Sequence, residues 1–364
     1  MDWTGEQRAA LDAVGRWLKA GESQVFRLFG YAGVGKTTLA RHIAESAKAE
    51  PAYAAFTGKA ALVMRSKGCA GATTIHALIY RAVEDEEGGA PTFKLNHDGP
   101  ASKAGLIVID ECSMVDAELG RDLMSFGKPI LVLGDPAQLP PVKGGGFFTE
   151  AAPDMMLSEI HRQAKDDPII RLSAEVRAGG RLAFGEYGAS RVIRRAEIGP
   201  DAVLAADQVL VGLNRTRRLY NQRIRELKHI DGVAPAAGDK LVCLRNDRAK
   251  GLINGGLWRV AALKPPRKDF LRMVLAAEDE IGRAKVKVAV LKQFFEGGEE
   301  ALTPAQRRES DQFDFGYALT VHKAQGSQWD EVVLFDESHA FGENRNRWLY
   351  TGLTRAAKRL TVVR

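Results

Sequence analysis

Cysteines and long apolar runs are scarce in this sequence. Its 364 residues include only three cysteines, Cys69, Cys112 and Cys243, and none has a second cysteine or a histidine at zinc-finger spacing. An odd number of scattered cysteines argues against a disulfide framework and indicates thiols in a reducing compartment. No segment approaches the ~20 apolar residues that a membrane-spanning helix needs. Residues 1–6 lack the basic and apolar regions of a secretory signal, so we expect a cytoplasmic protein.

Composition excludes disorder as the dominant state. Hydrophobic residues make up 45% and charged residues 27% of the chain, which is the balance of a folded globular protein. The length corresponds to about two domains. The net charge of +6 is compatible with a polyanionic partner. Many basic proteins bind no nucleic acid, however, so charge alone leaves that question open.

Short apolar segments alternate with helical ones over the first 157 residues. Leu11, Val14, Trp17 and Leu18 recur at helical spacing, and residues 36–47 read as a second helix. The predicted strands are residues 25–29, 52–56, 106–109 and 130–133. Apolar strands that alternate with helices form parallel sheets covered on both faces. The sequence therefore predicts an α/β domain.

Two segments depart from this alternation. Residues 84–100 are acidic and rich in glycine and proline, and are long enough for a small β-hairpin or a flexible loop. Residues 230–316 read as short strands, with Asn254-Gly255 as a hairpin turn signal. These strands predict a small barrel inserted in a second α/β domain. The apolar segments 207–212, 318–320 and 332–335 would belong to the sheet of that second domain.

The segment GYAGVGKT, residues 30–37, fits the P-loop pattern G-x-x-x-x-G-K-[ST]. It lies between a predicted strand and a predicted helix, where glycines let backbone N–H groups turn toward nucleotide phosphates. Lys36 is expected to reach the β- and γ-phosphates, and Thr37 to place its hydroxyl on Mg²⁺. The predicted nucleotide-binding residues of this loop are Gly30, Gly33, Gly35, Lys36, Thr37 and Thr38.

An apolar strand that ends in two carboxylates, LIVIDE at residues 106–111, supplies the second half of such a site. Asp110 is expected to bind Mg²⁺ through water, and Glu111 to orient or deprotonate the attacking water. Asp-Glu after an isolated strand is usually a solvated strand end, but a P-loop upstream favours catalysis. Together the two elements predict hydrolysis of a nucleoside triphosphate with Mg²⁺ and leave its purpose open.

Four further motifs indicate that purpose. They are LGDPAQLPP at 133–141, LSEIHRQ at 157–163, TVHKAQGS at 320–327 and YTGLTRA at 350–356. In this order the motifs resemble those of a superfamily 1 DNA helicase, of the branch that contains RecD, the phage helicase Dda and the Pif family. The resemblance extends from Gln7 to Arg355. It implies two RecA-like domains, residues 1–156 and 157–364, that hydrolyse ATP in the cleft between them.

The resemblance also implies roles for single residues. Gln7 would read the adenine edge, although a polar residue on the first helix is the simpler interpretation. Gln138 would link the γ-phosphate to the DNA-binding surface. Arg162 and Arg355 would be arginine fingers, since planar guanidinium groups stabilise the charge that spreads over the γ-phosphate in the transition state. ATP would then close the cleft and hydrolysis would reopen it.

The implied DNA contacts come from short loops in both domains. They are Thr57, Lys59, Thr74, His76, Thr320 and His322. Hydroxyl and backbone N–H groups suit phosphate contacts, which position a strand without reading its sequence. Any of these threonines could instead cap a helix. As a set, the loops would form one track for single-stranded DNA.

The two inserts have counterparts in the same branch. Residues 84–100 lie where it carries a β-hairpin pin that splits the duplex, and Phe93 would stack on the last base pair or else pack the hairpin onto its domain. Residues 230–316 lie where it carries a Src-homology-3-like barrel. Trp258 is expected in the core of that barrel rather than on a stacking surface. The sequence departs from RecD-type members at Gln328, where many have glutamate, which puts one ribose or phosphate contact in doubt.

The activity implied is ATP-dependent, 5′→3′ translocation on single-stranded DNA with duplex unwinding, by a monomer, at single-strand/duplex junctions. Replication, recombination or repair proteins are the expected partners, and nucleoid association is expected in a bacterium or phage. The chain is short for the branch, with no room for a nuclease or relaxase. Three alternatives remain: a translocase subunit of a larger complex that unwinds poorly alone, an RNA helicase, and a small-molecule kinase that uses the same P-loop.

Overall fold

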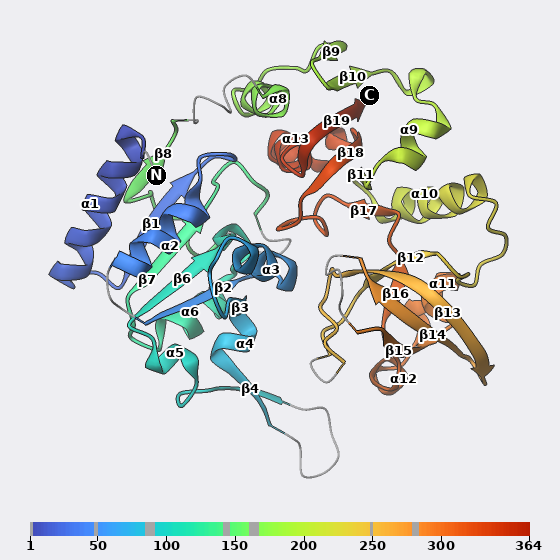
Figure 1. Ribbon diagram of the computed structural model, residues 1–364, viewed down its shortest axis with the longest axis horizontal. Helices are drawn as coiled ribbons and strands as arrows, with labels where there is room; N and C mark the ends of the chain where they lie inside the picture. The colour runs from blue at the N-terminus through green and yellow to red at the C-terminus, as the bar shows by residue number, and fades with distance from the viewer. Residues whose placement is uncertain are drawn as a thin grey trace. The chain divides into compact units, whose positions relative to one another are not determined.

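The computed structural model describes residues 3–46, 50–83, 92–140, 146–159, 167–247, 250–278 and 284–364. The chain divides into two compact units, Met1–Gly180 and Arg181–Arg364, called the first unit and the second unit below. Figure 1 traces them from the blue N-terminus to the red C-terminus. Among the described residues, no helix is both long enough and apolar enough to cross a bilayer.

The first unit is built on a six-stranded sheet of order β3-β2-β6-β7-β1-β8. All of its strand pairs are parallel, which confirms the predicted α/β fold. Its strands are β1 (Val25–Gly30), β2 (Pro51–Ala55), β3 (Thr73–Thr74), β6 (Leu106–Asp110), β7 (Ile130–Gly134) and β8 (Met155–Leu157). In the centre of the sheet, neighbouring residues of one strand face opposite layers: Val108 packs in one hydrophobic cluster and Ile107 in the other.

Helices cover both faces of this sheet (Figure 1). One face carries α1 (Gly5–Ala20), α2 (Lys36–Ser46) and α3 (Gly58–Ser66), and the other carries α4 (Ile75–Ile79), α5 (Pro100–Lys103) and α6 (Ala117–Met124). The α1 helix begins at a capping box, in which Thr4 and Gln7 satisfy each other's backbone N–H groups. It ends at Gly21, whose φ of 62° lies in the left-handed region that glycine adopts without strain. The unit also includes α8 (Pro168–Arg177).

The unit boundary differs from the predicted domain boundary, which placed residue 157 in the second domain. The predicted position falls inside β8, and β8 pairs with β1: Leu157 lies opposite Gly30. The first unit continues to Gly180. The backbone pairing of β8 with β1 thus keeps Leu157 in the first unit.

A two-stranded antiparallel hairpin, β4 (Tyr80–Val83) and β5 (Thr92–Leu95), extends from the first unit. Ala82 lies opposite Phe93 in its register. The hairpin therefore begins before the predicted segment 84–100, and the C-terminal part of that segment leads into α5 instead. Residues 84–91 of the prediction lie outside the described residues.

The second unit contains a six-stranded sheet of order β17-β11-β18-β19-β10-β9, in which only the β9–β10 pair is antiparallel among the described pairs. Its strands are β9 (Gly185–Tyr187), β10 (Ser190–Ile193), β11 (Gln208–Val211), β17 (Ala318–Thr320), β18 (Trp329–Phe335) and β19 (Ala356–Val363). The helices are α9 (Pro200–Ala205), α10 (Asn214–Leu227) and α13 (Arg345–Leu353). Gly352 lets α13 approach the sheet, since a Cβ there would lie 2.9 Å from Leu334 Cδ2.

Between β11 and β17 the chain forms a five-stranded antiparallel sheet of order β15-β14-β13-β12-β16, called the β insert below. Its strands are β12 (Lys240–Cys243), β13 (Leu257–Arg267), β14 (Phe270–Ala277), β15 (Val286–Leu291) and β16 (Phe313–Phe315), with short helices α11 (Gln293–Glu296) and α12 (Pro304–Glu309). The two edge strands of this sheet are β15 and β16. The chain just before β16 is hydrogen-bonded to β15, because Asp311 N donates to Ala289 O at 3.0 Å. Trp258 is 2% exposed in the insert core, as predicted. The remaining short 3₁₀ segments are Cys112–Met114, Arg195–Glu197, Glu299–Ala301 and Ser338–Asn344.

Buried ion pairs join the α10 helix to the β insert. Arg217 Nη1 lies 2.5 Å from Asp314 Oδ2, and Arg225 Nε lies 3.2 Å from each carboxylate oxygen of Asp239. Both arginines are less than 5% exposed, and Tyr317 also donates to Asp239. Full satisfaction by hydrogen bonds is what makes such burial of charge tolerable.

Candidate nucleotide and nucleic-acid sites

The predicted P-loop joins β1 to α2. Gly33 and Gly35 have φ values of 83° and 80°, which a residue with a side chain adopts only under strain. Gly30 is required for a different reason, since a Cβ there would lie 2.8 Å from Val34 Cγ2 and 2.9 Å from Leu157 Cβ. The three glycines of the motif thus give the loop its turn and its close packing on the sheet.

Lys36 folds back over this loop. Its Nζ donates to Gly30 O at 2.6 Å and to Tyr31 O at 3.0 Å. The backbone amides of residues 33–36 donate to no carboxylate in the described part of the chain. A loop with available amides, a helix N-terminus and an ammonium group is chemically complementary to nucleotide phosphates.

Thr37 and Asp110 meet at the foot of the loop. Thr37 Oγ1 donates to Asp110 Oδ2 at 2.7 Å, although 73 positions separate the two residues in sequence. A hydroxyl beside a carboxylate is the oxygen donor set that Mg²⁺ prefers. The half-buried Thr38 follows in the first turn of α2. The two halves of the predicted nucleotide site therefore come together in space.

Glu111 follows β6 in an unusual backbone conformation. Its φ and ψ of 54° and 45° are left-handed, which costs a non-glycine residue about 1 kcal/mol or more. Its N–H donates to Asp110 Oδ1 at 2.8 Å. Such strain is typical of functional sites. Behind it, complete burial raises the pKa of the Cys112 thiol, aided by the charges of Asp110 and Glu111.

Gln7 connects α1 to the P-loop. The side chain is 2% exposed, its Nε2 donates to Val34 O at 3.0 Å, and its Oε1 accepts from Thr4 N at 3.0 Å. The residue therefore supports the loop directly. Contact with adenine stays a prediction.

Glu6 is a connection that the sequence analysis missed. Its carboxylate accepts from Ser158 N at 2.7 Å, Ser158 Oγ at 2.6 Å and Glu159 N at 2.6 Å. Desolvation would raise the pKa of Glu6, but these hydrogen bonds outweigh it and the pKa is lowered. The two partners lie more than 150 positions apart, and no local pattern pairs them.

Gln138 lies after β7 and is 6% exposed. Its Oε1 is buried with no hydrogen-bond donor among the described residues, and the same holds for the hydroxyl of Ser113. Buried polar atoms without partners are rare and call for an explanation. An unsatisfied amide oxygen is compatible with a sensor that acquires its partner with ligand, which stays a prediction.

The two predicted arginine fingers differ in what the structure records. Arg162 lies outside the described residues. Arg355 is 5% exposed, and its guanidinium donates to Thr351 O, Ser327 O and Thr354 Oγ1 at 3.0–3.1 Å. These acceptors all belong to the second unit and fix the direction of the side chain.

The threonines predicted to contact DNA in the first unit are helix caps in the structure. Thr57 Oγ1 accepts from Ala60 N and Thr74 Oγ1 accepts from Ala77 N, both at 3.1 Å. Lys59 is 8% exposed. The capping alternative is therefore real for both residues, and contact with DNA stays a prediction for all three.

His76 lies in a row of aromatic rings. Its ring centroid is 6.4 Å from that of Phe56 and 5.6 Å from that of Tyr80. Desolvation lowers the pKa of His76, against the attraction of Asp116. Desolvation and a hydrogen bond to Asp122 raise the pKa of Tyr80. The exposed imidazole of His76 therefore lies beside two aromatic rings, in an edge-on and a tilted arrangement.

The second unit has a comparable row. The His322 ring lies 5.4 Å from Phe341, which stacks on Trp348 at 5.2 Å, and burial lowers the pKa of His322. Thr320 is 6% exposed at the end of β17 and accepts from Lys323 N. Both residues lie in one motif, as predicted, and their DNA contacts stay predictions.

Phe93 stands on the exposed face of the β4–β5 hairpin with 69% of its surface accessible. The alternative in which its ring packs the hairpin onto the unit is therefore wrong for this structure. Exposure of so large an apolar side chain leaves it available to a ligand.

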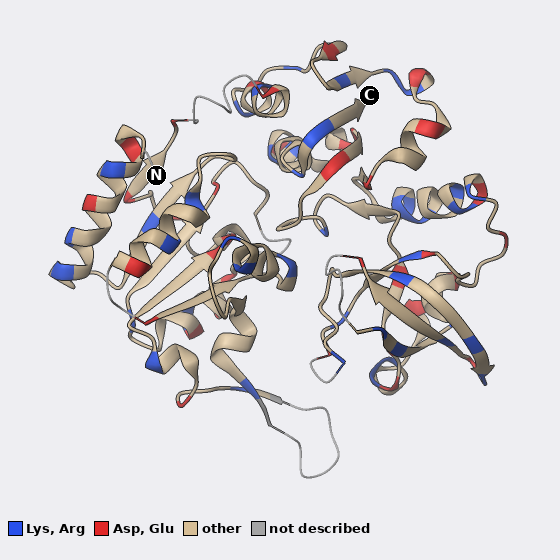
Figure 2. Ribbon diagram, viewed as in Figure 1, with Lys and Arg blue, Asp and Glu red and all other residues tan. Residues whose placement is uncertain are grey.

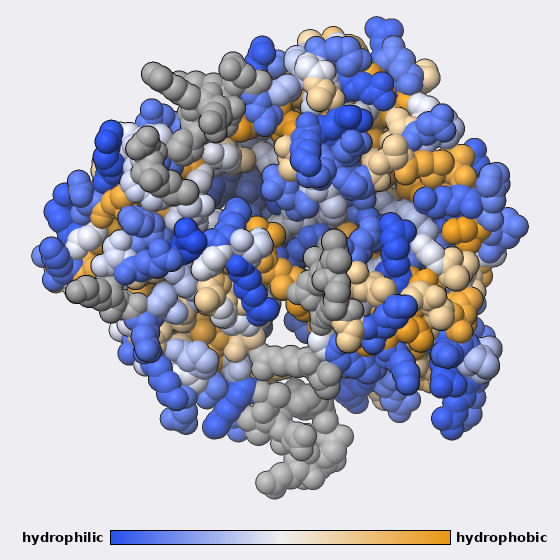
Figure 3. Space-filling view, in the orientation of Figure 1, coloured by the Kyte–Doolittle hydropathy of each residue, from blue (hydrophilic) through white to orange (hydrophobic). Residues whose placement is uncertain are grey.

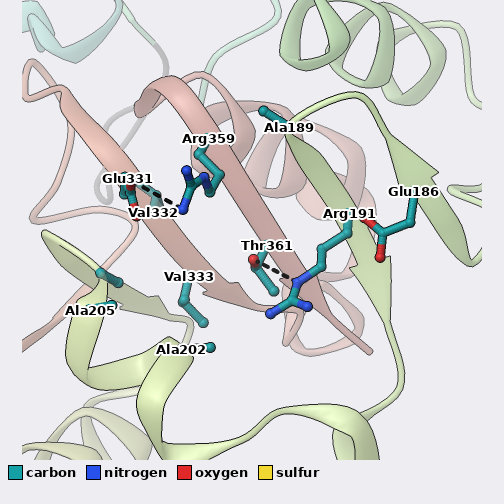
Figure 4. A pocket seen from close by; sticks show the side chains of 11 residues that line it. Glu186, Ala189, Arg191, Ala202, Ala205, Glu331, Val332, Val333, Arg359 and Thr361 are labelled. Atoms are coloured by element: carbon teal, nitrogen blue, oxygen red, sulfur yellow. Dashed lines mark hydrogen bonds and ion pairs between the residues drawn. The ribbon is translucent and has the colours of Figure 1, made fainter.

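A cavity of about 390 Å³ lies on the sheet of the second unit, against α9 (Figure 4). Arg191 and Arg359 enter it, and they bond to Thr361 and Glu331. Its floor contains alanines of α9 and valines of β18. None of the predicted site residues is among those that line it.

Two family models match this chain. The AAA domain model matches residues 3–197, and the UvrD-like helicase C-terminal domain model matches residues 315–363. Both therefore fall on the segments that carry the nucleotide motifs and the C-terminal motifs.

Similar proteins include the ATP-dependent RecD2 DNA helicase of Deinococcus radiodurans, 32% identical over 97% of this chain and 48% of its own length. RecD, a subunit of the RecBCD enzyme of Mycobacterium tuberculosis, is 27% identical over 92% of this chain and 66% of its own length. The chain thus spans about half of the RecD2 relative. A crystal structure of the Bacteroides Pif1 helicase with ADP-AlF3 and single-stranded DNA has the same fold, with a TM-score of 0.62, 20% identity and coverage of 99% of this chain and 92% of that one.

The P-loop geometry and the family models agree: the chain belongs to the AAA domain family, and its match to the UvrD-like helicase C-terminal domain and its similarity to RecD2 fit a superfamily 1 helicase of the RecD type.

Proposed function

We propose that this chain is an ATP-dependent DNA helicase that moves 5′→3′ on single-stranded DNA and unwinds duplex. The observation that carries the proposal is the junction of Thr37 with Asp110 beneath a P-loop whose Lys36 bonds only to backbone carbonyls among its described contacts. Polarity rests on the family alone, and unwinding of DNA rests on what the RecD2 relative is named for.

The nucleotide-binding residues fit ATP with Mg²⁺. Gly33, Gly35 and Lys36 would hold the phosphates, with Lys36 exchanging carbonyl oxygens for phosphate oxygens of the same hydrogen-bonding character. Thr37 and Asp110 would hold the metal. Bound Mg²⁺ would neutralise charge that develops on the phosphates.

The remaining chemistry belongs to groups around the loop. Glu111 would orient the attacking water and accept its proton, and its constrained backbone fixes the carboxylate direction. Arg355 and Arg162 would stabilise the transition state. The three hydrogen bonds of Arg355 would limit the entropy lost when its guanidinium engages.

The DNA-binding role is proposed for loops of both units. Thr57, Lys59 and Thr74 of the first unit would place phosphate-binding groups at helix N-termini. His76 and His322 would add stacking or hydrogen bonding without charge, since their pKa values are lowered. Phe93 would act as the wedge of a separation pin, and the β insert would be the Src-homology-3-like barrel of the branch.

A translocase subunit is the second candidate. One relative is itself named as a subunit of the RecBCD enzyme, and the chain spans about half of the RecD2 relative. Such a subunit would hydrolyse ATP and translocate, but would separate strands poorly without its complex.

The test is unwinding of two duplexes, one with a 5′ single-stranded tail and one with a 3′ tail, with single-stranded RNA of equal length as a second activator of ATP hydrolysis. We expect ATP-dependent unwinding from the 5′ tail only. Unwinding from the 3′ tail only would keep the motor and overturn the polarity. DNA-stimulated hydrolysis without unwinding would favour the subunit. Preferential activation by RNA would overturn the DNA specificity, and no activation by either would overturn the helicase.

A further inference from the structure

Six exposed cations lie on or next to the strands β13, β14 and β15 of the β insert. The strands β13 and β14 form a long hairpin, and β15 lies beside β14. Figure 2 shows blue segments toward the end of this hairpin, and Figure 3 shows hydrophilic side chains there, at the lower right of the view. The exposed cations are Lys264, Arg267, Lys268, Arg272, Lys285 and Lys287, called the basic face below.

Register explains why three of them share a face. Side chains alternate along each strand, and Met273 and Val288, which lie opposite each other, point into the insert core. Arg272 and Lys287, one position away on their strands, must therefore point outward. Lys264 lies directly opposite Arg272, and Lys287 is the diagonal neighbour of Arg272, so their Cα atoms are about 5–8 Å apart.

These cations have no internal partners among the described residues. Two carboxylates of the described residues nearby are already paired: Asp269 pairs with Lys292 at 2.9 Å, and Glu278 pairs with Lys240 and Arg259. The described part of the chain provides none of the six cations with an ion pair. Like charges held this close repel one another, so the arrangement is costly unless a polyanion neutralises it.

The character of the side chains between the cations points to duplex rather than single-stranded DNA. Proteins that hold single strands without sequence preference combine cations with exposed aromatic rings on which bases stack. The outward residues beside these cations are Ala262, Val274 and Ala289. The two aromatic residues of the described hairpin are both turned to the core: Trp258 is buried in it and Phe270 packs against it. Such a face can contact phosphates but cannot stack bases.

We infer that the basic face of the β insert is a second DNA-binding surface, one that holds the phosphate backbone of duplex DNA without reading sequence. The inference rests on the proposed DNA function but uses none of the motif residues.

The test compares two triple variants with equal loss of charge. The first is Lys264→Gln, Arg272→Gln and Lys287→Gln. The control is Arg223→Gln, Lys358→Gln and Arg359→Gln, exposed cations of the second unit that each pair with a carboxylate. Binding to a blunt duplex of about 20 base pairs is measured against salt concentration without ATP, with an oligothymidylate of equal length as the single strand.

We expect the first variant to bind the duplex at least about tenfold more weakly at low salt and to reduce the slope of log affinity against log salt by about 2–3, as three lost phosphate contacts require. Its affinity for the oligothymidylate and its single-strand-stimulated ATPase should match those of the unchanged chain. The control variant should match it in all assays. Because duplex binding without ATP does not require a working motor, this result is separable from failure of the proposed helicase function.

Three outcomes would overturn the inference. Unchanged duplex binding by the first variant would show that the basic face does not bind duplex DNA. An equal loss of affinity in the control variant would show that the effect comes from net charge and not from this face. A loss of affinity confined to the oligothymidylate would show that the basic face belongs to the track for single-stranded DNA. Poly-glutamate serves as a second probe, and loss of its binding alone, with duplex binding intact, would identify an acidic protein as the partner instead.

Discussion

The two units differ in whether a carboxylate of the chain accepts hydrogen bonds from the backbone amides at a strand–helix junction. In the first unit, the amides of residues 33–36 between β1 and α2 donate to no carboxylate of the described residues. In the second unit, the start of α10 after β11 is filled from within, because Glu337 accepts from Gly212 N at 2.7 Å, Leu213 N at 3.0 Å and Thr216 Oγ1 at 2.6 Å. Among the described residues, one strand–helix junction is left without an internal carboxylate and the other is closed by Glu337.

The comparison shows what turns an ordinary helix start into a nucleotide site. Both junctions follow a buried parallel strand, and both offer the positive end of a helix. The difference is whether the fold supplies its own anion. Glu6 is a third case, since it fills the amides of Ser158 and Glu159 next to the P-loop strand. A carboxylate from a distant segment can therefore stabilise a junction at the cost of its binding capacity.

The largest effect should come from the open junction. Lys36→Ala removes the ammonium group from the P-loop and should lower DNA-stimulated ATP hydrolysis by about 10²–10³-fold, the usual loss when one preorganised donor to a transition state is deleted. Phosphate release measures it, and single-strand affinity without nucleotide should stay unchanged. Lys19→Ala, on the exposed last turn of α1, is the matched control. Normal turnover by the Lys36 variant would refute the nucleotide site.

A smaller effect should follow from opening the closed junction. Glu337→Ala leaves two amides and a hydroxyl without their acceptor and should lower the free energy of unfolding by about 2–3 kcal/mol. Denaturant unfolding measures it, with the exposed Glu343→Ala as control. Inorganic phosphate should then raise the Tm of the Glu337 variant more than that of the unchanged chain. Equal responses would break the comparison, because the vacated amides would not then bind an anion.

The smallest effect should come from Glu6→Gln. An amide oxygen keeps some of the hydrogen bonds but loses the charge, so the free energy of unfolding should fall by about 1 kcal/mol at neutral pH. Because the folded pKa of Glu6 is lowered, its charge stabilises the fold above the unfolded pKa. That stabilisation is lost as the pH falls toward and through the folded value. Denaturant unfolding from pH 7 to about pH 4 should show the difference shrinking, and a constant difference would contradict the assignment. The exposed Glu22→Gln is the control.

Local patterns account for what the sequence predicted well. The P-loop and the strand that ends at Asp110 are contiguous motifs, so their strand, turn and helix could be read directly, and the parallel sheet followed from the alternation. The burial of Trp258 followed from its place among short apolar strands.

Contacts between distant segments account for what was missed. Glu6 and Glu337 accept hydrogen bonds from backbone amides more than 120 positions away. Every residue except proline has such an amide, so the sequence does not indicate which one a carboxylate will bind. The predicted domain boundary at 156/157 differs from the boundary of the compact units because β8 continues the first sheet through Leu157. The position of the hairpin was misjudged because Tyr80 begins a strand directly after α4, without a turn signal between them.

The buried ion pairs of α10 limit how the β insert can be removed or exchanged by protein engineering. A segment bounded by hairpin turns invites treatment as a cassette that can be excised or exchanged. Here, excision would remove Asp314 and Asp239, the carboxylates that pair with Arg217 and Arg225, and would leave both arginines of α10 without these partners. A deletion or graft of the β insert must therefore change the surface of α10 in the same step.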